Sequence, residues 1–128
     1  MQPRFLTKLV GECTDDCVWI VREPLIYQSL LAGVIEVPEG FRTDLASVPR
    51  LPIIYTLFGN RAHHESVVHD FLYQTHLTSK PVADKVFLEA MVARGKPFHI
   101  RWPMYWGVVL GGVSSYISGP ARLVTLNA

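Results

Sequence analysis

The feature that most constrains the fold of this chain is the segment from Arg61 to Gly95, which has the pattern of a helix hairpin. Apolar residues recur at helical spacing on both sides of a short polar turn, so we expect one helix over residues 62–75 and a second that ends near residue 94. Residues 78–81, Thr-Ser-Lys-Pro, supply a cap and a first-turn proline for the second helix, and Gly95 supplies its stop. Two antiparallel helices therefore form the predicted centre of the fold.

Asp84 is the residue of this hairpin whose position most needs an explanation. It heads a stripe of apolar side chains that lie three, four and seven positions further along the second helix. Because a buried carboxylate without a partner is costly, we expect a partner on the opposing helix, and His69 is the residue placed to be one. Lys80 and Lys85 are alternatives, although both have stems long enough to reach water.

The first helix carries three residues whose chemistry could be used together. His69 and Tyr73 lie four positions apart and share a face, and Asp70 lies about 100° further round the helix. Histidine titrates near neutrality, a buried carboxylate fixes its tautomer, and a hard cation with oxygen ligands stabilises a developing oxyanion. The pattern therefore fits a hydrolytic site with His69, Asp84 and Tyr73 as catalytic residues. A network that only braces the two helices fits it equally well.

The histidines before this group predict a metal site only weakly. His64 and His69 are five residues apart and lie on different helical faces, unlike the histidine pair of a zinc-binding helix. Glu65 and His69 are four apart and could share an ion. We interpret His63 and His64 as exposed first-turn residues.

The set His69-Asp70-x-x-Tyr73, followed eleven residues later by Asp84, resembles the catalytic helix pair of secreted phospholipases A2. The resemblance implies that His69 is the general base on a water, that Asp84 orients its imidazole, and that Tyr73 donates to Asp84. It also implies that Asp70 binds calcium, with zinc the less favoured ion, and the loop around Asp44 is the candidate source of further oxygen ligands. The glycine-rich calcium loop of those enzymes is missing, and residue 72 is leucine where they have a half-cystine.

Short β-like runs precede the hairpin, at residues 5–10, 17–21, 24–27 and 33–37. The spacing of about ten residues between turns is too short for parallel crossover units, so we expect a small antiparallel β-meander. Residues 40–50 form a predicted ordered loop, and residues 51–58 fit either a strand or a short helix.

Beyond the hairpin, residues 96–101 form a predicted connector and residues 102–117 a predicted third helix. Gly119 and Pro120 are expected to end that helix, and the rest is a predicted tail. The third helix fits a core helix, or an amphipathic surface that meets lipid or another protein. The expected fold is a single α+β domain over residues 1–128, β-rich over 1–58, helical over 61–118, with a tail over 119–128.

Composition excludes several classes of function. The formal net charge of +1 gives no global field for nucleic acid, so we expect no nucleic-acid partner. The N-terminal residues lack a signal-peptide core, and no apolar run reaches the roughly 18 residues of a spanning helix. Cys13 and Cys17 fit ordinary turn thiols better than half of a zinc site, and their redox state is left open.

Four segments together resemble a family of small tailed-phage and prophage proteins of unknown function. They are GFRTDLASVPR at residues 40–50, VHDFLY at 68–73, ADKVFLEAM at 83–91, and Met-Tyr at 104–105. The resemblance implies a virion or tail protein that is in the host cytoplasm before assembly and whose partners are other virion or tail proteins. We expect either a metal-assisted hydrolase acting on a lipid or peptidoglycan bond of the host envelope, or a non-enzymatic structural protein of the particle.

Overall fold

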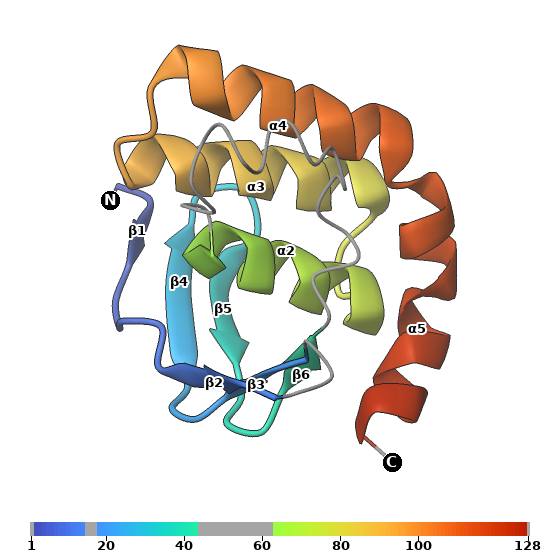
Figure 1. Cartoon of the computed structure of the whole chain (residues 1–128). Coiled ribbons are helices and arrows are strands. Elements are labelled where there is room, and N and C mark those ends of the chain that lie inside the picture. Colours follow the sequence, from blue (N-terminus) through green and yellow to red (C-terminus); the bar gives the residue numbers. More distant parts are fainter. Residues whose placement is uncertain (1, 15–17, 44–62, 128) are drawn as a thin grey trace.

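The computed structural model describes residues 2–14, 18–43 and 63–127 (Figure 1). Antiparallel strands come first along the chain and helices follow, which confirms the predicted α+β class. Asp44, the greater part of the predicted loop over residues 40–50, and the segment 51–58 lie outside the described residues.

The strands form two three-stranded antiparallel sheets instead of one meander. The first sheet has the order β1-β4-β5, with β1 at Arg4–Phe5, β4 at Leu25–Ser29 and β5 at Gly33–Val37. The second has the order β2-β3-β6, with β2 at Gly11–Cys13, β3 at Trp19–Val21 and β6 at Arg42–Thr43. The expected strand over residues 5–10 is therefore mostly a connection. Arg22-Glu23-Pro24 separates β3 from β4, and because proline has no N–H to donate, this break divides the strands between two sheets.

The helix hairpin is present as predicted. Helix α2 spans His63–Thr75 and helix α3 spans Lys80–Ala93. Ser79 is the N-cap residue of α3 in an extended conformation, although its side chain makes no capping hydrogen bond, and Pro81 lies in the first turn. Gly95 has a φ of +77° just beyond the helix, and its N–H donates to the carbonyl oxygen of Val92 at 2.9 Å.

The predicted third helix and tail are wrong in their boundaries, because the chain forms two further helices there. Helix α4 spans Phe98–Gly111 and helix α5 spans Val113–Asn127. Gly112 lies at the junction, where an added Cβ would be 2.7 Å from the Tyr73 hydroxyl oxygen and 2.5 Å from the Val108 carbonyl oxygen. The helix axis therefore breaks where the chain passes close to Tyr73, and α5 turns to run along one end of the molecule (Figure 1).

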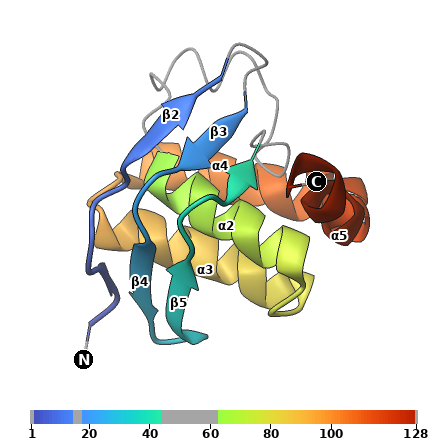
Figure 2. The same ribbon diagram turned by 90° about the horizontal axis from the view of Figure 1, so that it is seen from below.

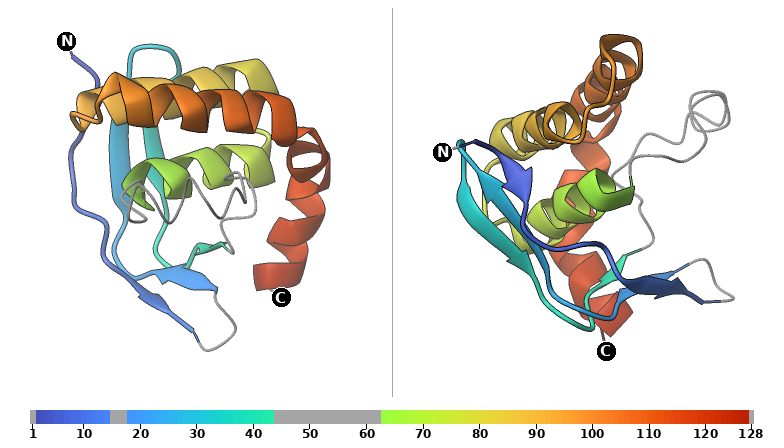
Figure 3. Two further views of the ribbon diagram at one scale, coloured as in Figure 1. Left: turned by 45° about the horizontal axis from the view of Figure 1, so that its top comes forward. Right: turned by 90° about the vertical axis from the view of Figure 1, so that its left-hand side faces the viewer.

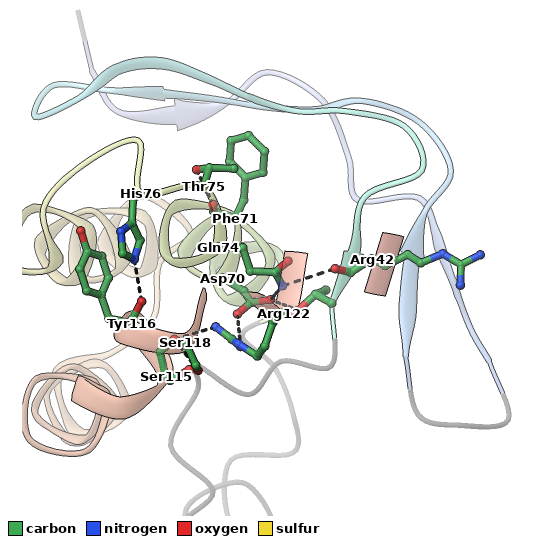
Figure 4. A network of polar contacts seen from close by, with 11 residues as sticks. Arg42, Asp70, Phe71, Gln74, Thr75, His76, Ser115, Tyr116, Ser118 and Arg122 are labelled. Carbon is green, nitrogen blue, oxygen red and sulfur yellow. Dashed lines mark hydrogen bonds and ion pairs between the residues drawn. The ribbon is translucent and has the colours of Figure 1, made fainter. Parts of the chain in front are cut away.

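Gly119 and Pro120, which we expected to end the helix, lie inside α5. An added Cβ on Gly119 would be 2.1 Å from the carbonyl oxygen of Tyr73, so glycine here permits close packing of α5 on α2. Pro120 removes the N–H that would bond the carbonyl of Tyr116, four residues earlier. The Nε2 of His76 lies 2.6 Å from that oxygen and takes the place of the missing donor (Figure 4). The helix therefore continues to Asn127.

The helices cover one face of the β4–β5 layer. Helices α2 and α3 pack on these strands, and α4 lies on the far side of α3 (Figures 2 and 3). The main core joins strand residues such as Tyr27 and Ile35 to Leu72 and Val86 of the hairpin. A second cluster between α3 and α4 contains Phe87, Met91, Met104 and Val108. No helix in the described ranges has the length and apolar character needed to cross a membrane.

Candidate functional site

The Asp84 carboxylate, 2% exposed, is the centre of a buried polar network in the first turns of α3. Its Oδ1 atom accepts a hydrogen bond from the Tyr73 hydroxyl at 2.5 Å and lies 2.8 Å from Nε2 of His69. Its Oδ2 atom accepts from Nζ of Lys80 at 2.7 Å. The structure thus brings together the three residues of the predicted catalytic group. We call these four residues the Asp84 centre.

Lys80 belongs to the Asp84 centre although sequence reasoning left it only as an alternative partner. Besides Asp84, its ammonium group donates to the carbonyl oxygens of Val108 and Val109, each at 3.1 Å. Those carbonyls lie at the C-terminal end of α4, where a positive charge is favoured by the helix dipole. The i, i+4 spacing from Lys80 to Asp84 was visible in the sequence, but the contact with α4 was not. The other alternative, Lys85, is exposed.

Burial and hydrogen bonding set the charges in the Asp84 centre. Burial lowers the pKa of His69, which has no exposed surface, below its ordinary value in spite of the nearby Asp84 carboxylate. Burial would raise the pKa of Asp84, but the hydrogen bonds from His69, Lys80 and Tyr73 outweigh it and lower that pKa. Because an ionised carboxylate only accepts, we assign the imidazole proton to Nε2. At neutral pH the centre therefore holds a neutral histidine and a Lys–Asp ion pair.

Asp70, the predicted calcium ligand, belongs to a separate buried network with no exposed surface of its own. Its Oδ2 atom accepts from the Thr43 hydroxyl of β6 and from Nε2 of Gln74, the latter at 2.6 Å. Its Oδ1 atom is 3.3 Å from a guanidinium nitrogen of Arg122 in α5 (Figure 4). The same guanidinium donates to the carbonyl of Ser115 at 2.9 Å. We call Asp70, Thr43, Gln74 and Arg122 the Asp70 clamp.

Sequence reasoning missed Arg122 because it falls in the segment that we expected to be a tail. Its long separation from Asp70 leaves no periodic pattern to connect the two. The one available indication was the burial expected for Asp70, which requires a partner that the hairpin itself does not contain.

The metal prediction concerns Asp70 and Asp44, and Asp44 lies outside the described residues. Calcium at Asp70 stays a prediction, for a carboxylate that three donors now bond and that has no exposed surface. Within residues 2–14, 18–43 and 63–127 there is no group of three His, Cys, Asp or Glu side chains arranged to hold a metal ion.

Of two interpretations of the first turn of α2, one stays a prediction and the other needs correction. Glu65 is fully buried and its Oε1 atom is 2.8 Å from Nε of Arg94, while an ion shared with His69 stays a prediction. His64 is half-buried instead of exposed, and its Nε2 atom accepts the N–H of Leu9 at 3.1 Å. Both residues tie α2 to neighbouring segments.

In the Asp84 centre the His69 imidazole is held in one orientation, but it has no solvent-exposed surface. The His69 ring packs against Tyr73 and Phe87, with ring centroids 4.1 and 4.9 Å away. His69 and Tyr73 are each 0% exposed. A general base has to reach a substrate or a water molecule. In this structure the arrangement therefore fixes the imidazole without presenting it to solvent.

Comparison with known proteins identifies the family. A family model described as "Protein of unknown function (DUF1353)" matches residues 19–108. The chain belongs to this family. No protein in the search of curated proteins and no solved structure matches the chain.

The DUF1353 match runs from the start of β3 to Val108, a buried residue near the end of α4. It includes the whole Asp84 centre and three members of the Asp70 clamp, namely Asp70, Thr43 and Gln74. Arg122, the fourth member of the clamp, lies beyond the matched segment. The Asp84 centre is therefore complete within the part of the chain that defines the family.

Proposed function

We propose that this DUF1353 protein is a non-enzymatic structural protein of a tailed-phage particle, in which the Asp84 centre holds three helices in fixed register. The observation that carries the proposal is that His69 has no exposed surface and is held by Asp84, Tyr73 and Phe87. The phage context rests on the resemblance of residues 40–50, 68–73 and 83–91 to tailed-phage and prophage proteins. Its partners in the proposal are other virion or tail proteins.

The contacts of the Asp84 centre support a bracing role because they join three different helices. Helix α2 provides His69 and Tyr73, α3 provides Asp84 and Lys80, and α4 provides the carbonyls that Lys80 bonds. A shift of any one helix would leave a buried charge or hydroxyl without its partner, which is costly. A network that is satisfied only in one arrangement fixes the relative positions of the helices.

The test combines unfolding and turnover measurements on the full chain, with wild type, Asp84→Asn and His69→Gln. We expect Asp84→Asn to lower the melting temperature by about 10 °C, the equivalent of about 3 kcal/mol in a domain of this size. We expect that neither the wild type nor either variant hydrolyses phospholipid vesicles or peptidoglycan at a rate above that of the protein-free blank. Wild-type turnover that is lost in His69→Gln at an unchanged melting temperature would overturn the proposal.

A second candidate function is the metal-assisted hydrolysis of an ester or amide bond in the host envelope. The observation in its favour is the 2.8 Å contact between Nε2 of His69 and Asp84, with Tyr73 on the same oxygen, as the phospholipase resemblance implies. In this proposal calcium binds Asp70 and Asp44. It expects calcium-dependent turnover that a chelator abolishes and that both His69→Ala and Asp70→Asn remove. Turnover that is absent with calcium and with zinc excludes it.

A further inference from the structure

Helix α4 is apolar on both of its faces. Its inner side buries Met104 and Val108 against α3. Its outer side exposes apolar residues at four-residue intervals, which places them along one stripe: Phe98 is 66% exposed, Trp102 41%, Trp106 50% and Leu110 78%. A helix that is apolar all round is ordinarily buried, whereas α4 forms the outermost layer of the fold (Figure 1). Contact with water alone therefore does not account for the apolar side chains of the outer stripe.

An apolar groove continues this stripe onto α3 and the β4–β5 turn. The groove has a volume of about 840 Å³, and its walls include Leu30, Leu31, Leu88, Val92, Trp102 and Trp106. Among the lining residues Lys85 and Glu89 carry charge. The Glu89 carboxylate is already occupied, because it accepts the Tyr27 hydroxyl at 2.7 Å and the Leu30 N–H at 3.2 Å. The exposed charge at the groove is the cation Lys85.

The charges in the chain around α4 have one sign. From residue 90 to residue 128 the sequence contains no Asp or Glu, while it contains Arg94, Lys96, Arg101 and Arg122. Arg122 is bound in the Asp70 clamp and Arg94 pairs with Glu65, which leaves Lys96 just before α4 and Arg101 in its first turn. An apolar, tryptophan-bearing face with cations beside it, and with the neighbouring Glu89 carboxylate already hydrogen-bonded, is complementary to an anionic lipid surface.

We propose that the outer face of α4, with the groove beside it, docks on an anionic lipid bilayer with the helix axis in the plane of the membrane. Fourteen residues make a helix of about 21 Å, too short to span the hydrocarbon layer, so the helix lies along the interface. Trp102 and Trp106 enter the headgroup boundary, where aromatic side chains with one polar edge are favoured. Lys85 and Arg101 meet the lipid phosphates. This inference does not rest on the proposed structural role in a particle.

The test is co-sedimentation of the full chain with vesicles, together with tryptophan emission. Vesicles of phosphatidylcholine mixed with phosphatidylglycerol should bind the protein and shift its tryptophan emission to the blue. Pure phosphatidylcholine vesicles should bind it less, and added salt should weaken binding to the mixed vesicles. The double variant Trp102→Ser/Trp106→Ser should bind the mixed vesicles at least about tenfold more weakly, because it removes the two largest inserted side chains.

The matched control is Val10→Ser, which removes an apolar side chain of similar exposure, 40%, beside β2. This variant should bind the mixed vesicles like the wild type. Circular dichroism of each variant checks that the fold is kept. The proposal is overturned if the wild type does not bind mixed vesicles, or if the double variant binds them as well as the wild type does. It is also overturned if sedimentation equilibrium shows a wild-type dimer that the double variant lacks, because a second copy of the chain would then cover the stripe.

Discussion

Asp84 and Asp70 are two buried carboxylates that each have three hydrogen-bond donors, yet they are built from different parts of the chain. The partners of Asp84 lie 15, 11 and 4 residues away, all within the helix hairpin. Two of the partners of Asp70 lie 27 residues before it and 52 residues after it. The Asp84 centre joins neighbouring helices, whereas the Asp70 clamp joins the hairpin to β6 and to α5.

The two networks also differ in chemistry. The Asp84 centre contains a histidine, so its charge state can change with pH. The hydrogen bonds to Asp70 come from a hydroxyl, an amide and a guanidinium that stays charged. The difference teaches that the hairpin carries its own brace, which contains a titratable histidine, while the clamp ties the hairpin to distant segments of the chain. The following predictions test this division, from the largest expected effect to the smallest.

Replacing Asp84 should lower the stability of the protein the most. Asp84→Asn removes the charge that neutralises Lys80 and places an amide among three donors, so the free energy of unfolding should fall by about 3–5 kcal/mol. Urea denaturation measures it. The control Glu36→Gln, an exposed acid on β5, should change stability by less than about 0.5 kcal/mol. Equal effects of the two substitutions would show that Asp84 is not a brace.

The close packing of α5 on α2 should be the next most sensitive feature. Gly119→Ala places a Cβ 2.1 Å from the Tyr73 carbonyl oxygen, so backbone has to move and the loss should be about 2–3 kcal/mol. Gly111→Ala is a matched control, because a Cβ there meets nothing within 4 Å. Thermal unfolding should separate the two variants clearly. A Gly119→Ala protein as stable as Gly111→Ala would contradict the described position of α5.

The Asp70 clamp should depend on Arg122. Arg122→Met leaves Asp70 with two neutral donors and should lower the free energy of unfolding by about 2 kcal/mol. The comparison variant is Arg22→Met, which breaks an exposed ion pair with Glu12 and should have no measurable effect. If both substitutions behave alike in urea denaturation, Arg122 does not close the clamp.

Tyr73 should contribute least to the Asp84 centre. Tyr73→Phe keeps the packed ring and removes one hydrogen bond to Asp84, so we expect a loss of about 1 kcal/mol. The same substitution in the Asp84→Asn background should cost less, because the two residues act through one contact. Additive losses in this double-mutant cycle would mean that the hydroxyl stabilises the fold by another route.

The sequence predicted the parts of this structure that depend on local pattern. The helix hairpin, the end of α3 before Gly95 and the neighbourhood of His69 and Asp84 follow from helical periodicity, which relates residues within a few turns. The split of the strands into two sheets, the long α5 and the Arg122 contact depend on tertiary packing. Pro120 shows the reason most clearly, because the carbonyl that it leaves free is bonded by a distant side chain, His76.

The protonation of His69 tests the central claim, that the Asp84 centre is a brace, most directly. Burial lowers its pKa below the ordinary value of about 6.5, so the unfolded chain binds a proton first as the pH falls and the protein should lose stability below about pH 6.5. Nuclear magnetic resonance of the imidazole nitrogens, with His69→Gln to assign the signal, follows this residue alone. We predict a ring that is neutral and protonated on Nε2 at neutral pH. A His69 that titrates at or above pH 6.5 would contradict the account, because an imidazole buried in the brace should bind a proton less readily than one in water.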